Sequence, residues 1–174
     1  MPLPIEDYGL IGDCHTAALV GRDGSLDWLC FPRFDSGACC AALLGDPEHG
    51  RWLIAPAGEV LEGSRQYRDG TLILETQFTT REGTVRLVDC MPLSNERSDV
   101  LRIVEGVSGR VAMRMELIIR LDYGSIVPWV RKPDHTLLAT AGPATLELHT
   151  QVATHGENMK TVAELHVSKG ERTH

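Results

Sequence analysis

Glycine and proline interrupt this 174-residue chain so often that long helices have little room. The 17 glycines and nine prolines leave few windows in which apolar residues recur at helical spacing over three turns. The best helix candidate is SGACCAALLGD (36–46), which Gly45 would end. The chain must therefore fold mainly from short elements joined by turns, and short strands meet that condition best.

Several segments between the breaks alternate apolar and polar side chains, as half-buried strands do. In VAMRMELIIR (111–120), the apolar residues at 111, 113, 115, 117 and 119 share one face, while Arg114, Glu116 and Arg120 share the other. TLILETQFTT (71–80) and REGTVRLVDCMP (81–92) are the arms of a predicted hairpin that turns at Gly83. DVLRIVEGVSG (99–109) predicts a further strand, ending in a turn at Ser108 and Gly109.

Both ends of the chain show the same pattern. HTAALVGRDGSLDWLCF (15–31) predicts two strands joined at Asp23-Gly24, which tolerate positive φ. Three short alternating runs follow near the C-terminus, namely HTLLATA (135–141), ATLELHT (144–150) and TVAELHVS (161–168). After the last of them, Lys169-Gly170-Glu171 predicts a turn into one more strand. Strands spaced about 8–12 residues apart are typical of sandwiches. We predict an all-β antiparallel sandwich with one short helix.

Length and charge limit the classes of function. With 43% hydrophobic residues, the chain is long enough for one domain with one core, spanning 1–174. A net charge of −7 argues against nucleic acid and anionic membranes as partners. No apolar run approaches the roughly 20 residues of a membrane helix, and Glu6 and Asp7 stand where a signal peptide would be basic. We expect a cytoplasmic protein, and the five unevenly spaced cysteines fit a reducing compartment without disulfides.

Motifs for metal, phosphate or nucleophilic chemistry are missing. Asp13 and His15 share a face if their segment is extended, but no close pairs of cysteine or histidine complete a zinc site. No G-x-S-x-G elbow singles out a serine or cysteine nucleophile, and neither glycine-rich phosphate loop occurs. We expect no metal and no cofactor.

Two segments have the composition of a sugar-contacting surface, in which aromatic rings stack on pyranose faces and charged groups bond hydroxyls. The first, residues 27–36, holds Asp27, Trp28, Phe31, Arg33, Phe34 and Asp35. The alternative is that Trp28 and Phe31 are core residues and that Asp27 and Asp35 make turn or capping bonds. The second, RLDYGSIVPWVRKPDH (120–135), is interrupted by two prolines and predicts a long loop; it holds Arg120, Asp122, Tyr123, Trp129 and Arg131.

Long stretches of the chain resemble a known family. These stretches cover residues 4–46, 65–92 and 102–124. Their most specific motifs are GSLDWLCFPRFDS (24–36) and LDYG…PWV (121–130). The chain is similar, over residues 4 to about 170, to the N-terminal domain of the bacterial trehalase-like and glucoamylase-like enzymes of glycoside hydrolase family 15. One departure lies at Leu121, where relatives tend to have phenylalanine, and this places a sugar-contact role for position 121 in doubt.

The resemblance implies a β-sandwich that precedes an (α/α)6 catalytic barrel. In such inverting α-glycosidases, the barrel supplies both catalytic carboxyl groups, roughly 6.5–9.5 Å apart. No glutamate of the present chain matches the family's catalytic motifs, so we expect this chain to be inactive by itself and the barrel to be its partner. Whether the enzyme cuts trehalose, maltose-type or dextran-type substrates stays open.

We therefore expect residues 27–36 and 120–131 to form the edge of the sandwich that faces the barrel and shapes the rim of its pocket. The alternatives are a free-standing carbohydrate-binding sandwich that holds an α-glucoside, and a protein-interaction domain that never meets sugar. A chain that stops at His174 leaves an unpaired strand edge, and we expect a homo-oligomer on that ground.

Overall fold

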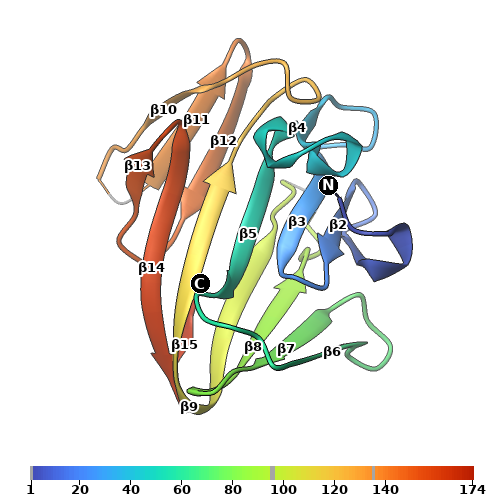
Figure 1. The fold of residues 1–174 in the computed structure, drawn as a ribbon. Coiled ribbons are helices and arrows are strands. Elements are labelled where there is room, and N and C mark those ends of the chain that lie inside the picture. The colour runs from blue at the N-terminus through green and yellow to red at the C-terminus, as the bar shows by residue number, and fades with distance from the viewer. Residues whose placement is uncertain (1, 95–96, 135) are drawn as a thin grey trace.

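The computed structural model describes residues 2–94, 97–134 and 136–174, and nearly all of its regular structure is strand (Figure 1). His135, the first residue of the predicted 135–141 strand, lies outside the described residues. Three short 3-10 helices accompany the strands: η1 (Ile5–Asp7), η2 (Ala42–Leu44) and η3 (Pro47–His49). The strands are β1 (Tyr8–Gly12), β2 (Ala17–Gly21), β3 (Ser25–Cys30), β4 (Ala38–Cys40), β5 (Arg51–Pro56), β6 (Glu62–Tyr67), β7 (Leu74–Thr79), β8 (Gly83–Cys90), β9 (Leu101–Ile118), β10 (Trp129–Arg131), β11 (Thr136–Ala141), β12 (Ala144–His149), β13 (His155–Glu157), β14 (Lys160–Ser168) and β15 (Arg172–Thr173).

The strands form one curled 12-stranded antiparallel sheet and one three-stranded sheet. The path through the large sheet is β1-β2-β3-β5-β9-β8-β7-β6, and β10-β11-β12 make the small one. A 14-residue apolar core joins the two, because Leu137, Ala139 and Leu148 of the small sheet pack with residues of the large sheet. The predicted all-β sandwich-like class is confirmed.

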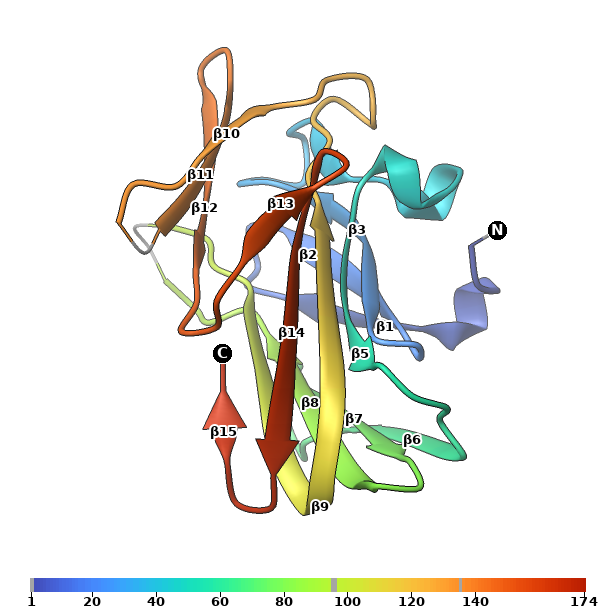
Figure 2. The same ribbon diagram turned by 60° about the vertical axis from the view of Figure 1, so that its left-hand side comes forward.

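Strand β9 connects the two halves of the large sheet. Figure 2 shows it descending, bending sharply and returning, so that its two arms lie in different layers. The first arm pairs with β8 and β15, and the second arm pairs with β5 and β14. The sequence predicted separate strands on either side of Ser108 and Gly109; the structure keeps one strand element and bends it at this place.

Glycine is required at the bend. Gly109 has φ of 65°, and a Cβ there would lie 2.0 Å from the carbonyl oxygen of Glu82. This close approach lets the β7–β8 hairpin pair with β9 as far as the bend, in the register Gly83 to Gly109.

The strand predictions hold for most segments. Residues 111, 113, 115 and 117 are buried, as their alternation predicted, and so are Leu74, Thr76 and Phe78 on one face of β7. The turn at Asp23-Gly24 joins β2 to β3, with Gly24 at φ of 84°. The turn after Lys169 leads into β15.

The helix prediction for 36–46 is wrong in its first half. Residues Ala38–Cys40 form β4, whose three side chains are all buried and whose backbone pairs with β3. Only the single 3-10 turn η2 follows, and it ends at Gly45 as expected. Pairing with β3 stabilises extended backbone here because it satisfies polar groups that burial would otherwise leave unbonded. All five cysteines are free thiols, and Cys30, Cys39 and Cys40 are buried.

A fully buried ion pair lies where the layers meet. The Arg102 guanidinium is 2.8 Å from the Asp89 carboxylate across β9 and β8, and neither side chain has exposed surface. It also donates to the carbonyl oxygens of Trp52 in β5 and, at 2.8 Å, of Gly24 in the β2–β3 turn. This one side chain therefore ties its own strand β9 to β8, β5 and the β2–β3 turn.

No helix in the described part of the chain is long and apolar enough to cross a membrane.

Removing the Arg102 charge should leave Asp89 buried and unpaired. We expect Arg102→Met to lower the free energy of unfolding by about 3–5 kcal/mol in urea denaturation. The control is Arg97→Met, which removes an ion pair with Asp99 that is largely exposed and should cost less than about 0.5 kcal/mol. Equal losses for the two variants would contradict the role given to Arg102.

A second pair of variants tests the bend. Gly70→Ala changes a glycine at φ of 68° that has open space around its Cβ position, and should cost about 1–2 kcal/mol of unfolding free energy. Gly109→Ala has nearly the same φ and adds the clash with Glu82, so it should cost clearly more. Thermal and urea unfolding measure the loss of unfolding free energy in each variant. Equal losses would show that the close approach of Gly109 to Glu82 adds no cost of its own.

Candidate functional site

The two segments singled out in the sequence meet at one end of the sandwich, the upper end in Figure 1. The ring of Tyr123 lies 6.0 Å from that of Trp28, tilted by 42°. Two backbone hydrogen bonds place the second segment on β4: Arg120 N donates to Cys39 O at 3.1 Å, and Tyr123 N donates to Ala38 O at 3.2 Å. Residues about 90 apart in sequence thus form one continuous surface.

A tight turn presents Tyr123 there. Asp122, Tyr123 and Gly124 all have positive φ, and an isolated bridge between Leu121 and Ile126 closes the turn. The hydroxyl of Ser125 donates to the carbonyl oxygen of Asp122 at 2.8 Å. The prediction of one long loop over 120–135 is wrong in part, because residues 129–131 form β10, which pairs with β11. The two prolines lie outside β10 and therefore remove none of its hydrogen bonds.

In the loop after β3, Arg33 and Asp35 form an exposed two-pronged ion pair. Both Arg33 Nε and Nη2 are 2.8 Å from the Asp35 carboxylate oxygens. This hydrogen bonding holds the pKa of Asp35 below its ordinary value. Phe34, between them in sequence, leaves 63% of its surface exposed. The loop therefore presents one aromatic ring beside an oriented pair of charges.

Asp27 has a different environment. It is 6% exposed, and both carboxylate oxygens accept hydrogen bonds, from Ser25 Oγ at 2.5 Å and from Tyr8 OH at 2.7 Å. Burial, followed by the bond to Asp27, raises the pKa of Tyr8 well above its ordinary value. Asp27 thereby ties β3 to β1.

Trp28 is half-buried and packs against a small cluster of buried residues, namely Cys30, Ala38 and Ala41.

Arg120 belongs to an ion network beside the surface. Its side chain is 7% exposed, and Nη1 donates to the carbonyl oxygens of Ile119 and Met159. Glu48 lies 3.6 Å from Arg120 and 2.9 Å from Lys160, which in turn is 3.5 Å from Glu116. Burial raises the pKa of Glu116, but hydrogen bonding and charge from Arg51 and Lys160 outweigh it and lower that pKa overall. The network fixes β5, β9, β14 and η3 to one another.

The elements at this end of the sandwich carry several exposed apolar side chains. We call them the apolar end; its members are Phe34, Leu44, Tyr123, Ile126, Val127, Trp129 and Met159. Trp129 is 82% exposed and Met159 is 76% exposed. Sequence reasoning named the aromatic members, and its segment 120–131 includes Ile126 and Val127, but it missed Leu44 and Met159. Their only signal is that they are apolar residues beside turns, and exposed apolar residues are too common for that to be informative.

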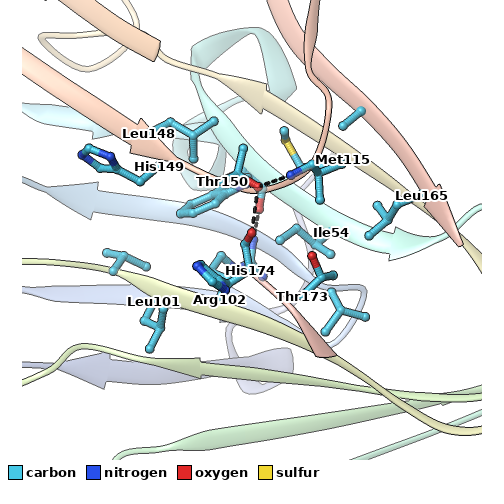
Figure 3. A pocket seen from close by; sticks show the side chains of 15 residues that line it. Ile54, Leu101, Arg102, Met115, Leu148, His149, Thr150, Leu165, Thr173 and His174 are labelled. Atoms are coloured by element: carbon cyan, nitrogen blue, oxygen red, sulfur yellow. Dashed lines mark hydrogen bonds between the residues drawn. The ribbon is translucent and has the colours of Figure 1, made fainter. Parts of the chain in front are cut away.

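The described residues offer little for cofactor chemistry. No group of three His, Cys, Asp or Glu side chains among them is placed to hold a metal ion. Asp13 accepts hydrogen bonds from the backbone of His15 and Thr16 within its own turn. A cavity of about 70 Å³ lies between the two sheets. Figure 3 shows the side chains that line it, which are mostly apolar, such as Ile54, Met115 and Leu148. It is too small for a sugar, since ligand pockets usually exceed about 300 Å³.

Comparison with known proteins identifies the family of the chain. The family described as Trehalase-like, N-terminal matches residues 1–172. The chain belongs to this family. It is 33% identical over 139 residues to a trehalase of Mycolicibacterium smegmatis, a match that covers 69% of the chain and 21% of the relative.

Other trehalases give similar matches. Trehalase 1 of Sulfolobus acidocaldarius is 32% identical over 76% of the chain and 22% of its own length, and a trehalase of Thermoplasma volcanium is 28% identical over 84% and 25%. The chain thus spans roughly a fifth to a quarter of the length of these curated relatives. No solved structure matches it.

The anchoring role of Asp27 gives a prediction. Tyr8→Phe removes a hydrogen bond to a buried carboxylate and should lower the free energy of unfolding by about 1–3 kcal/mol at neutral pH. Because the pKa of Tyr8 is raised on folding, its stabilisation is complete below the ordinary value of 10.0 and is lost as pH rises above it. The difference between wild type and variant should therefore shrink above pH 10.

Urea denaturation across this pH range measures both effects. Tyr123→Phe is the matched control, since no hydrogen bond of the Tyr123 hydroxyl occurs among the described residues. A pH-independent difference for Tyr8→Phe would contradict the bond to Asp27.

Proposed function

We propose that this trehalase-like N-terminal domain is the non-catalytic part of a family 15 glycoside hydrolase of the trehalase type and docks on a catalytic barrel through its apolar end. The observation on which this rests is the juxtaposition of the two motif segments, through Trp28 and Tyr123, on a surface rich in exposed apolar side chains. A surface region rich in exposed apolar side chains favours an interaction with another part of the protein.

Phe34, Tyr123 and Trp129 are the best candidates for anchoring residues. Each combines a large ring with considerable exposure. Buried aromatic residues contribute most to the binding energy of protein interfaces, and their neighbours chiefly exclude water. Backbone pairing holds each of them: Tyr123 N donates to Ala38 O of β4, Phe34 N donates to His15 O, and Trp129 pairs with β11. Little backbone conformational entropy is therefore lost when they dock.

We further propose that the polar side chains of this surface shape the rim of the substrate pocket. Arg33 and Asp35 are exposed and hold each other in a fixed orientation, so that they can bond sugar hydroxyls in defined directions. Asp122 stands on the neighbouring turn. Acid and base catalysis would belong to two carboxyl groups of the barrel, which protonate the glycosidic oxygen and activate water on the opposite face of the sugar.

A free-standing carbohydrate-binding sandwich is the second candidate, because Trp129 is exposed to 82% and could stack on a sugar by itself. The two candidates differ in one observable property. A binding module takes up sugar without a barrel, whereas a docking domain changes activity only when joined to one.

A chimaera tests the proposal. Residues 1–172 replace the matching N-terminal part of the Mycolicibacterium smegmatis trehalase, and hydrolysis of trehalose is measured beside the truncated trehalase and the isolated domain. We expect activity in the chimaera alone. Hydrolysis by the isolated domain would contradict a non-catalytic role, and sugar binding by it in calorimetry would favour the second candidate.

Surface variants of the chimaera then locate the interface. Phe34→Ser with Trp129→Ser should lower activity by about tenfold or more, the effect of about 1.4 kcal/mol. Leu61→Ser with Leu72→Ser removes two exposed apolar residues, 55% and 49% exposed, from the region of β6 and should leave activity unchanged. Equal effects of the two double variants would contradict docking through the apolar end.

A further inference from the structure

A groove runs between the three-stranded sheet and the β13–β14 hairpin. Its volume is about 530 Å³, large enough for a short stretch of extended polypeptide. In Figure 2, β10 and β13 stand on either side of this region without pairing to each other. The lining includes Val130 and Arg131 of β10, His155 and Glu157 of β13, and Leu117 of β9.

Both strands that border the groove are sheet edges. Within the described residues, β10 pairs with β11 alone and β13 pairs with β14 alone. Each strand therefore offers backbone donors and acceptors on one side. Such edges accept a further strand, and proteins use this mode to bind extended peptides.

The charges at the β10 side of the groove are positive. Lys132 reaches across and donates to Thr154 Oγ1 at 2.8 Å, which holds its ammonium group at the groove. Arg131 is exposed and makes no ion pair with any described residue. Among the described residues, Glu157 is the one carboxylate in the lining. Arg120 and Lys160 also line the groove, but Glu48 and Glu116 outside it neutralise them.

This arrangement disfavours a second copy of the chain. The chain has a net charge of −7, but a symmetric contact at the groove would bring Arg131 and Lys132 of both copies together. Like charges placed opposite each other in an interface oppose binding. An extended segment with carboxylates on one face and apolar side chains on the other fits better, since Leu117 and Val130 supply apolar contacts beside the cations.

We propose that the groove binds an acidic, extended segment of the catalytic region by strand addition. This inference rests on the proposed function, because Val127 and Met159 belong both to the apolar end and to the groove lining. The segment would pair with the β10 or β13 edge, turn its carboxylates toward Arg131 and Lys132, and extend the interface beyond the apolar end.

The test uses a short capped peptide of alternating glutamate and valine, labelled for fluorescence anisotropy, with the whole 174-residue chain. We expect binding that weakens as salt increases, and an affinity lowered by about tenfold or more in Arg131→Glu with Lys132→Glu. Arg81→Glu with Lys169→Glu is the control, because it makes the same charge change at turns outside the groove. A lysine–valine peptide should bind neither protein.

Two further measurements separate backbone pairing from charge alone. A glutamate–proline peptide has the same charge but lacks half of the amide donors, and should bind about tenfold more weakly or worse. Circular dichroism verifies that the variants fold, and Arg131→Met with Lys132→Met supplies a milder form of the same test. Equal binding of the two acidic peptides, or equal affinity in the groove and control variants, would overturn the proposal.

The result is independent of the docking experiment. Peptide binding at the groove beside an inactive chimaera would count against the proposed function alone. An active chimaera that depends on Phe34 and Trp129, together with no peptide binding, would overturn the groove proposal alone.

Discussion

The buried ion pair of Arg102 and Asp89 is the constraint around which the sandwich is organised. Its guanidinium binds carbonyl oxygens of β5 and of the β2–β3 turn as well as the carboxylate of β8, so the charges leave water without losing their bonding partners. Burying an ion pair adds little net stability over an apolar pair, but breaking one is costly. We infer that the pair selects one arrangement of the layers over others that would leave a buried charge unpaired.

The bend of β9 links this arrangement to the position of the apolar end. Because Gly109 lets the strand reverse direction, the second arm runs beside β5 and ends at Ile118, close to β4. The chain then passes over Cys39 and Ala38 into the turn that presents Tyr123. The pairing of β9 with β5, and of the following backbone with β4, thus fixes the position of the turn that carries Tyr123. The side chain of Tyr123 takes no part in this pairing and remains partly exposed.

The groove and the apolar end suit different parts of one task. Aromatic side chains on a rigid base favour affinity, whereas charge and strand edges favour register and orientation. The proposed function requires both, because a pocket rim works only if its side chains reach the substrate at fixed angles.

Alternation of side chains, glycine placement and motif content were sufficient to determine the all-β class, most strand positions, the β7–β8 hairpin and the family. These features are local, and each strand face is fixed by a period of two residues. Only the tertiary structure decided that 38–40 is a strand rather than a helix, that residues 129–131 of the second motif segment pair with β11, that Asp27 is an anchor and not a surface group, and which turn residues join the apolar end. Each of these depends on a partner outside the segment itself, namely β3, β11, Tyr8 and β4, and the pattern within a short segment contains no information about such a partner.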